Sequence, residues 1–281
     1  MKNRELFVSD LDGTLLDNNG ELSRQSVELL NECISSGALF TIATARTPAT
    51  VVPMFRDVSM KLPGIVMTGA AWWHFDTQTF SHLHFLNKHE ASFVYETFHK
   101  NGVLPFVYTI PQTTEKHILE VYYNNPRPCV ADINFIEQRR NLSLKHLNLN
   151  TPLPDDLLDS VLLFFASGEK SHLESIKDEI LSKTACSVTC YEDVYNPGTG
   201  LIEIFAGGVS KASAIKDMCK ELNIEKITVF GDNLNDLPMF AVADTSVAVA
   251  NAMTEVTEKA TLSIGTNLEN SVPKYILKAL R

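Results

Sequence analysis

The sequence predicts an α/β fold, in which a parallel sheet with helices on both faces is interrupted by a second, α+β domain. Two observations support this. Near both ends of the chain, short apolar runs of strand character alternate with segments of helical periodicity. Between them lies a stretch that loses this alternation. The chain has 281 residues, which suits one large domain or two.

The first part alternates strand and helix. Leu6-Phe7-Val8 reads as a buried strand. Ser23 is placed to cap a helix that Gly37 ends. The next elements are a strand at 39–43, a helix beginning at Thr47-Pro48 and a strand at 64–67. This order favours a parallel sheet.

The middle part has a different pattern. Residues 72–85 suit a hairpin, with Trp72 and Trp73 better explained by packing than by substrate stacking. The patterns that follow predict helices at 87–101 and 169–182, and strands at 105–109, 118–123, 161–165 and 187–191. Residues 124–154 give no clear assignment.

The α/β rhythm returns near residue 201. The pattern predicts strands at 201–205, 227–230 and 246–249, and helices at 210–222, 235–242 and 272–280. We therefore expect one core built from residues 1–84 and 195–281, with an inserted domain at 85–194. Such an insertion belongs beside the ligand edge of the sheet, where it can act as a lid.

Composition narrows the possible partners and the compartment. The net charge of −10 argues against a nucleic-acid surface, which needs a basic patch. Five cysteines, with no CxxC pair, suggest reduced thiols and a cytoplasmic protein. The sequence shows no signal-peptide pattern and no apolar run long enough to span a membrane. We expect no nucleic-acid or membrane partner.

The most informative motif is Asp10-Leu11-Asp12-Gly13-Thr14, directly after the first strand. Ligands bind at the carboxyl ends of strands in an open parallel sheet. One carboxylate there can attack a substrate while the other moves protons, and both can face a cation. Taken alone, the pair could also be a solvated turn at the end of a strand.

A second acidic motif, Gly231-Asp232-Asn233-Leu234-Asn235-Asp236, also follows a buried strand. Asp232 and Asp236 can point at one site, although both could instead cap the helix that follows. Four carboxylates at close range, from Asp10, Asp12, Asp232 and Asp236, would repel one another and require a cation. An all-oxygen ligand set suits Mg²⁺.

Two further segments lie between the acidic motifs. Thr44, at the end of the second strand, offers a hydroxyl for a phosphate oxygen. Lys211, at a helix start, offers a point charge for a phosphoryl group, although a surface lysine is the alternative. Arg46 suits either substrate binding or anchoring of its own loop.

In order, these motifs resemble those of the haloacid dehalogenase-like (HAD) phosphohydrolases. The residues concerned are Asp10-Leu11-Asp12-Gly13-Thr14, Thr44, Lys211 and Gly231-Asp232 with Asn235-Asp236. The position and length of the insertion resemble the Cof-type phosphatases with an α/β cap. The resemblance implies a Rossmann-like core and a Mg²⁺-dependent phosphoric monoester hydrolase.

The resemblance also implies roles. Asp10 would be the nucleophile that forms an aspartyl-phosphate, and Asp12 the general acid and base. Thr44, Lys211 and Asn235 would bind the phosphoryl group, with Asn235 alternatively fixing Lys211. The metal ligands would be Asp10, Asp12 through its main-chain carbonyl, Asp232 and Asp236.

Two positions depart from the family pattern. Ala45 stands where Cof-type proteins usually have glycine, which costs little if its φ is negative. Gly69-Ala70-Ala71 stands where they usually have Asn-Gly-Ala. Neither change touches the charged motifs.

The expected function is hydrolysis of small phosphate monoesters, sugar phosphates or related metabolites. A phosphomutase on the same core and a non-catalytic binding module for phosphorylated metabolites are the alternatives. A dehalogenase is disfavoured because its reaction has no need of the acid that Asp12 supplies.

Overall fold

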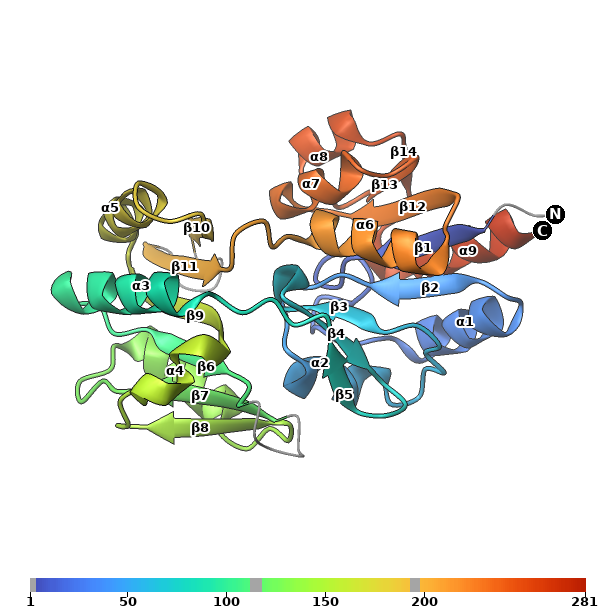
Figure 1. The fold of residues 1–281 in the computed structure, drawn as a ribbon. Coiled ribbons are helices and arrows are strands. Elements are labelled where there is room, and N and C mark those ends of the chain that lie inside the picture. Colours follow the sequence, from blue (N-terminus) through green and yellow to red (C-terminus); the bar gives the residue numbers. More distant parts are fainter. Residues whose placement is uncertain (1–3, 112–117, 193–197) are drawn as a thin grey trace. The chain divides into compact units, whose positions relative to one another are not determined.

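The computed structural model describes residues 4–111, 118–192 and 198–281. Contacts divide the chain into two units, Met1–Ser81 with Ser210–Arg281, and His82–Val209. Each is described separately below and is drawn in Figure 1.

The first unit is the predicted α/β core. Its elements are β1 (Glu5–Ser9), α1 (Arg24–Ser35), β2 (Leu39–Ile42), α2 (Pro48–Phe55), β3 (Gly64–Val66), β4 (Ala71–His74), β5 (Thr79–Ser81), α6 (Lys211–Leu222), β12 (Lys226–Gly231), α7 (Leu237–Phe240), β13 (Thr245–Val249), α8 (Thr254–Lys259), β14 (Leu262–Ile264) and α9 (Ser271–Leu280). Five strands form a parallel sheet in the order β14-β13-β12-β1-β2. β3, β4 and β5 form a separate antiparallel sheet, joined to β2 by a parallel bridge between Ala43 and Ile65.

Helices cover both faces of the parallel sheet, as Figure 1 shows. Alternate side chains of each strand point to opposite faces. Phe7 of β1 faces a cluster formed with α1, α2 and α9. The neighbouring residues Leu6 and Val8 face a second hydrophobic cluster, which is formed with α6, α7 and α8. The carboxyl ends of β1, β2, β12 and β13 therefore meet at one edge of a three-layer unit.

Helix starts in this unit follow the local sequence. The Ser23 side chain accepts a hydrogen bond from the Ser26 N–H and caps α1. Pro48 occupies the first turn of α2, as predicted. The hairpin expected near residue 72 is β4 and β5, where Trp73 packs edge-on against Phe80 with ring centroids 4.8 Å apart.

The second unit is built on a six-stranded sheet. Its elements are α3 (Lys88–Lys100), β6 (Phe106–Thr109), β7 (Leu119–Tyr123), α4 (Val130–Arg139), β8 (Lys145–Leu149), β9 (Val161–Glu169), α5 (Lys170–Leu181), β10 (Ser187–Glu192) and β11 (Thr199–Phe205). The strand order is β10-β11-β9-β6-β7-β8, antiparallel except for β7 with β8. α3 and α5 pack on one face around Val107 and Phe164. α4 packs on the opposite face of the sheet, where its Phe135 ring contacts Phe106 and Phe165.

The sequence prediction differs from the structure at β11. We assigned residues 201–205 to the core, but β11 pairs with β9 and β10 of the second unit. The second unit therefore continues to Val209. The predicted boundary between residues 194 and 195 lies outside the described residues. Composition cannot assign such a strand, because its sheet is decided by pairing with distant segments.

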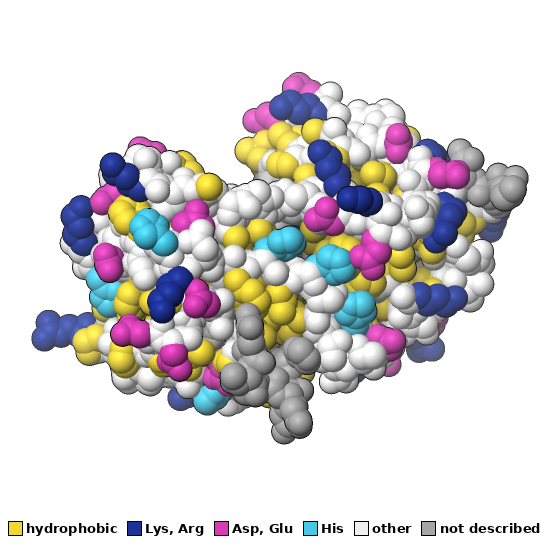
Figure 2. All heavy atoms as spheres, in the orientation of Figure 1, with side chains coloured by type: hydrophobic (Ala, Val, Ile, Leu, Met, Phe, Trp, Pro, Cys, Tyr) yellow, Lys and Arg dark blue, Asp and Glu magenta, His cyan; other side chains and the backbone are white. Residues whose placement is uncertain are grey.

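The surface, the cysteines and the length of the helices can be described for these residues. On the face that Figure 2 shows, Lys and Arg side chains are interspersed with Asp and Glu. All five cysteines are free thiols. No helix within the described ranges combines the length and the apolar character that a bilayer crossing requires.

Candidate active site

The first acidic motif forms a tight turn after β1. The Asp10 N–H donates to the Phe230 carbonyl of β12, 3.0 Å away, which holds the strand end in the sheet. Gly13 has φ +76°, a left-handed conformation that favours glycine. A Cβ at Gly13 would also overlap the carboxylate of Asp232. The glycine therefore lets the two acidic motifs approach closely.

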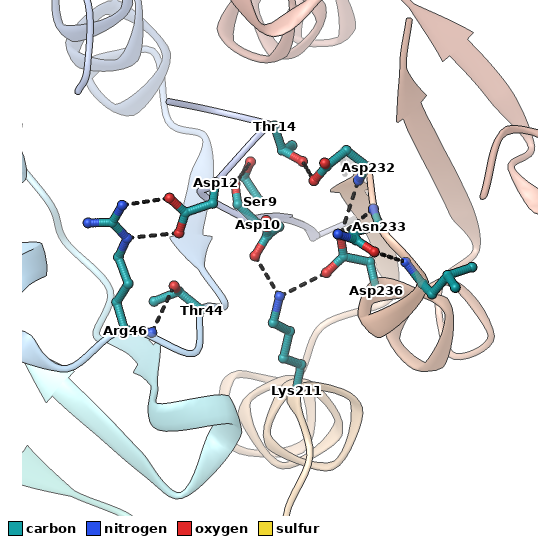
Figure 3. A network of polar contacts seen from close by, with 11 residues as sticks. Ser9, Asp10, Asp12, Thr14, Thr44, Arg46, Lys211, Asp232, Asn233 and Asp236 are labelled. Atoms are coloured by element: carbon teal, nitrogen blue, oxygen red, sulfur yellow. Dashed lines mark hydrogen bonds and ion pairs between the residues drawn. The ribbon is translucent and has the colours of Figure 1, made fainter. Parts of the chain in front are cut away.

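Lys211 lies between the two acidic motifs, as Figure 3 shows. It is the first residue of α6, which Ser210 caps by accepting the Ser213 N–H at 3.0 Å. The Lys211 ammonium lies 2.5 Å from Asp10 Oδ1 and 2.8 Å from Asp236 Oδ1. The side chain is fully enclosed, and the two carboxylates raise its pKa despite the opposing effect of burial. Lys211 is thus a charged partner of the site.

The second acidic motif follows β12. Asp236 is completely buried, and its Oδ2 accepts the N–H groups of Asp232 and Asn233 at 3.1 and 3.3 Å. Asp232 Oδ1 accepts the Thr14 hydroxyl at 2.8 Å. One carboxylate oxygen from each of Asp10, Asp232 and Asp236 lies within 4.8 Å of the others. These three oxygens are close enough to share one cation.

The carboxylates carry more negative charge than their protein partners balance. Burial and the nearby Asp236 raise the pKa of Asp10 to about 8, against the lowering effect of Lys211. Burial also raises the pKa of Asp232 to about 6. With all four carboxyl groups ionised, they face two cations, Lys211 and Arg46, which leaves two negative charges in excess. A divalent cation would balance them, and oxygen donors fit Mg²⁺.

Asp12 forms an ion pair with Arg46 and is not one of the three converging carboxylates. Arg46 Nε donates to Asp12 Oδ2 at 2.8 Å and Arg46 Nη2 to Asp12 Oδ1 at 2.5 Å. A two-point contact of this kind fixes the plane and direction of the carboxylate. The sequence left two roles open for Arg46, substrate binding or anchoring of its loop. The structure adds a third role, in which Arg46 orients Asp12.

Thr44 is buried at the end of β2 and offers a free hydroxyl proton. Its Oγ1 accepts the Arg46 N–H at 3.1 Å. The hydroxyl proton itself has no acceptor among the residues that the structure describes. A bound oxyanion would supply that acceptor.

Asn235 does not contact Lys211, which was one of the two roles expected of it. It lies exposed in a short 3₁₀ turn, Leu234–Asp236, and its side chain has no hydrogen bond to any described residue. The contact that fixes Lys211 comes from Asp236 instead. Sequence spacing could not show whether Asn235 or Asp236 contacts Lys211. Which of the two side chains faces inward depends on the geometry of the 3₁₀ turn.

Three residues after β3 have positive φ. The angles are 48° at Met67, 57° at Thr68 and 99° at Gly69. A Cβ at Gly69 would overlap the Ser210 carbonyl, directly before Lys211. Its backbone angle and this close approach both require glycine at position 69. Ala45 is not among the positive-φ residues, so alanine fits there without strain.

Two contributors to the site were given no role from the sequence. Thr14 donates to Asp232, as described above. The Asn251 side-chain amide donates to the Gly13 carbonyl at 2.7 Å and accepts the Asn267 N–H at 3.0 Å. Asn251 follows the end of β13, and this position is the feature of the sequence that could have indicated its place in the site.

Comparisons with known proteins agree with this geometry. A family model for haloacid dehalogenase-like hydrolases matches residues 7–276. The 5-amino-6-(5-phospho-D-ribitylamino)uracil phosphatase YwtE of Bacillus subtilis is 25% identical, over 95% of both chains. The pyridoxal phosphate phosphatase YbhA of Escherichia coli is 23% identical, over 98% of both.

The fold is shared with solved structures. A haloacid dehalogenase-like hydrolase from Bacteroides thetaiotaomicron superimposes with a TM-score of 0.77 and 21% identity, covering 98% of this chain and 99% of that one. The expected enzyme class, a phosphoric monoester hydrolase, is confirmed by the family match together with the curated phosphatases. The chain belongs to the haloacid dehalogenase-like hydrolase family.

Proposed function

We propose that this enzyme hydrolyses small phosphate monoesters through a phosphoryl group carried on Asp10. The observation that supports this most directly is the grouping around Asp10. Its buried carboxylate lies 2.5 Å from the Lys211 ammonium, in the turn that also holds Asp12. A nucleophile, a cation for phosphoryl oxygens and a second acid thus meet at one sheet edge.

In the proposed first step, an Asp10 oxygen bonds to phosphorus while the bond to the ester oxygen breaks. Asp12 gives its proton to the departing alkoxide. In the second step Asp12 takes a proton from water, whose oxygen bonds to phosphorus and releases phosphate from Asp10. The enzyme ends in its starting state, and water is the only co-reactant.

The remaining residues hold the group that is transferred. Lys211 would bind phosphoryl oxygens, where negative charge increases in the reaction, together with the Thr44 hydroxyl, whose proton has no acceptor among the described residues. Asp236 holds Lys211 in position. Asn235 is exposed, so its proposed phosphate contact requires its side chain to turn toward the ligand.

We propose Mg²⁺ as the cofactor. Asp10, Asp232 and Asp236 would hold it with carboxylate oxygens, and Asp12 with its main-chain carbonyl. When bound, the ion neutralises the excess charge and polarises phosphoryl oxygens. The three converging carboxylates and the raised pKa values of Asp10 and Asp232 support this assignment.

For substrates, we propose phosphorylated metabolites of small size, sugar phosphates or related compounds, in the cytoplasm. The named substrates of the two relatives are small phosphate esters that carry a nitrogen heterocycle. Free thiols support a reducing compartment.

The test is hydrolysis of p-nitrophenyl phosphate and a panel of sugar phosphates and pyridoxal 5′-phosphate, with Mg²⁺ and with EDTA. Asp10→Asn should abolish turnover and Asp57→Asn, at an exposed site, should retain it. If no compound is turned over although Mg²⁺ binds, the hydrolase is rejected in favour of the mutase or the binding module.

A further inference from the structure

A lysine in the second unit is buried without a counter-charge. Lys145 begins β8, pairs with Leu119 of β7 and is only 7% exposed. Its ammonium lies 5.1 Å from the ring centroid of Tyr108 and 5.9 Å from that of Phe135. It has no hydrogen bond or ion pair with any residue in the described ranges. Burying an unpaired ammonium is strongly unfavourable.

The charges around Lys145 increase this cost. The Arg139 guanidinium lies 4.0 Å from the Phe135 ring centroid, on the same aromatic wall. Burial and the positive charge of Arg139 lower the pKa of Lys145 to about 7. The pKa of Tyr108 is raised mainly by burial, and the negative charge of Glu203 on β11 raises it further. Glu203 contributes no described ion pair to Lys145. Arg139 is thus the charged group that acts most directly on Lys145, and it is of the same sign.

Tyr108 provides a second donor without an acceptor. Its side chain is 3% exposed, and its hydroxyl makes no hydrogen bond to a described residue. The buried carboxylate of Asp132, on the same helix as Arg139, is by contrast satisfied. It accepts the hydroxyls of Tyr123 and Ser167 at 2.5 and 2.6 Å. Lys145 and Tyr108 have no comparable contact with a described residue.

Packing on aromatic rings is the simplest explanation for Lys145. Cation–π contact offsets part of the desolvation cost, but among the described residues it gives no acceptor to the N–H donors of the ammonium or to the Tyr108 hydroxyl. A group that supplies both an acceptor and a negative charge would satisfy all of them. That chemistry is an oxyanion.

We propose that Lys145, together with the Tyr108 hydroxyl, binds an oxyanion, a phosphate or a carboxylate, in the second unit. Two sources have this chemistry: an anionic group on a substrate, and free inorganic phosphate. The site itself does not depend on the proposed function, because its residues lie outside the unit that holds Asp10. Its link to substrate does rest on that function.

The direct test is ¹³C NMR of the intact protein with lysine labelled at Cε. The Lys145 signal is assigned by its loss in Lys145→Met and followed over pH, with inorganic phosphate or with chloride at equal ionic strength. We expect a pKa near 7 in chloride and a rise of about one unit or more in phosphate, since a bound anion favours the charged amine. An unchanged Lys145 titration in phosphate would argue against free phosphate as the ligand.

Enzyme kinetics separate the two sources. If the anion belongs to the substrate, Lys145→Met raises KM for esters with a second acidic group more than for p-nitrophenyl phosphate. The exposed control Lys88→Met should not do so. If the anion is free phosphate, the NMR response appears without this KM effect. Neither response, in protein that hydrolyses p-nitrophenyl phosphate, overturns the oxyanion site and leaves the proposed function standing.

Discussion

The ion pair between Arg46 and Asp12 is the detail of this site that most affects the chemistry. Both carboxylate oxygens of Asp12 are held, at 2.8 and 2.5 Å, by a planar guanidinium. A proton donor works only when its oxygen lies within hydrogen-bond reach of the leaving group. Arg46 thus positions the ionised Asp12 carboxylate, the form that takes a proton from water in the second step; to donate a proton to the ester oxygen, Asp12 must release one of these two contacts.

Replacing Arg46 with Met should therefore lower kcat by about 10- to 100-fold, because a displaced acid transfers its proton poorly. Arg46→Lys should restore little, since an ammonium cannot make the two-point contact. KM and kcat are measured with p-nitrophenyl phosphate. Arg56→Met removes an exposed arginine and serves as the control. A raised KM with unchanged kcat would instead make Arg46 a substrate-binding residue.

At the scale of elements, the start of α6 determines where Lys211 lies. Ser210 caps the helix in a capping box with Ser213. Its side chain accepts the Ser213 N–H, and the Ser213 side chain accepts the Ser210 N–H. The strained segment Met67–Gly69 packs against the Ser210 carbonyl from the other side. The position of the Lys211 ammonium is therefore fixed by a helix terminus held at two points.

Ser210→Ala should lower the free energy of unfolding by about 1 kcal/mol and also reduce turnover, because Lys211 follows the cap directly. The matched control is Ser23→Ala, which removes the N-cap of α1 in the same unit. Chemical denaturation and steady-state kinetics should show a stability loss in both variants and a marked loss of turnover in Ser210→Ala only. Equal turnover in the two variants would refute the positioning role of this cap.

Local signals in the sequence predicted many elements but not their partners. Ser23, Pro48 and Asn87 mark helix starts that the structure contains, because capping is local chemistry. The sequence did not predict α4 within residues 124–154, and β11 was assigned to the wrong unit. Strand pairing joins segments far apart in the chain, so no local pattern specifies it.

The same limit applies to the site. The carboxylates and Lys211 stood out because charged residues follow buried strands or begin a helix. The Arg46–Asp12 pair and the contact of Asn251 with Gly13 join residues remote in sequence. Asn235 lies exposed because a 3₁₀ turn, not a regular helix, begins at Leu234. These details depend on three-dimensional geometry.

At the scale of the whole molecule, every residue of the candidate active site lies in the first unit, although two distant parts of the sequence supply them. Asp10, Asp12, Thr44 and Arg46 precede the second unit, and Lys211, Asp232 and Asp236 follow it. The sheet joins these two parts through the β1–β12 pairing. Binding at the site should therefore stabilise the first unit as a whole.

Mg²⁺ at roughly 100 times its Kd should raise the free energy of unfolding by about 2.7 kcal/mol, because it binds the folded site. Hydrogen exchange should slow around residues 10–14 and 231–236. Asp232→Asn should lose most of this stabilisation and Asp57→Asn should keep it. Equal stabilisation of both variants would show that Mg²⁺ binds elsewhere.

The most direct test of the central claim is to trap the phosphoryl group on Asp10. The wild-type protein and Asp10→Asn are mixed with Mg²⁺ and ³²P-labelled p-nitrophenyl phosphate, quenched in acid within one turnover and digested, and the labelled peptide is identified by mass spectrometry. The proposed chemistry predicts a base-labile label on the wild-type peptide that contains residue 10, and none in the variant. Turnover by Asp10→Asn at the wild-type rate, or a label on another residue, would contradict it.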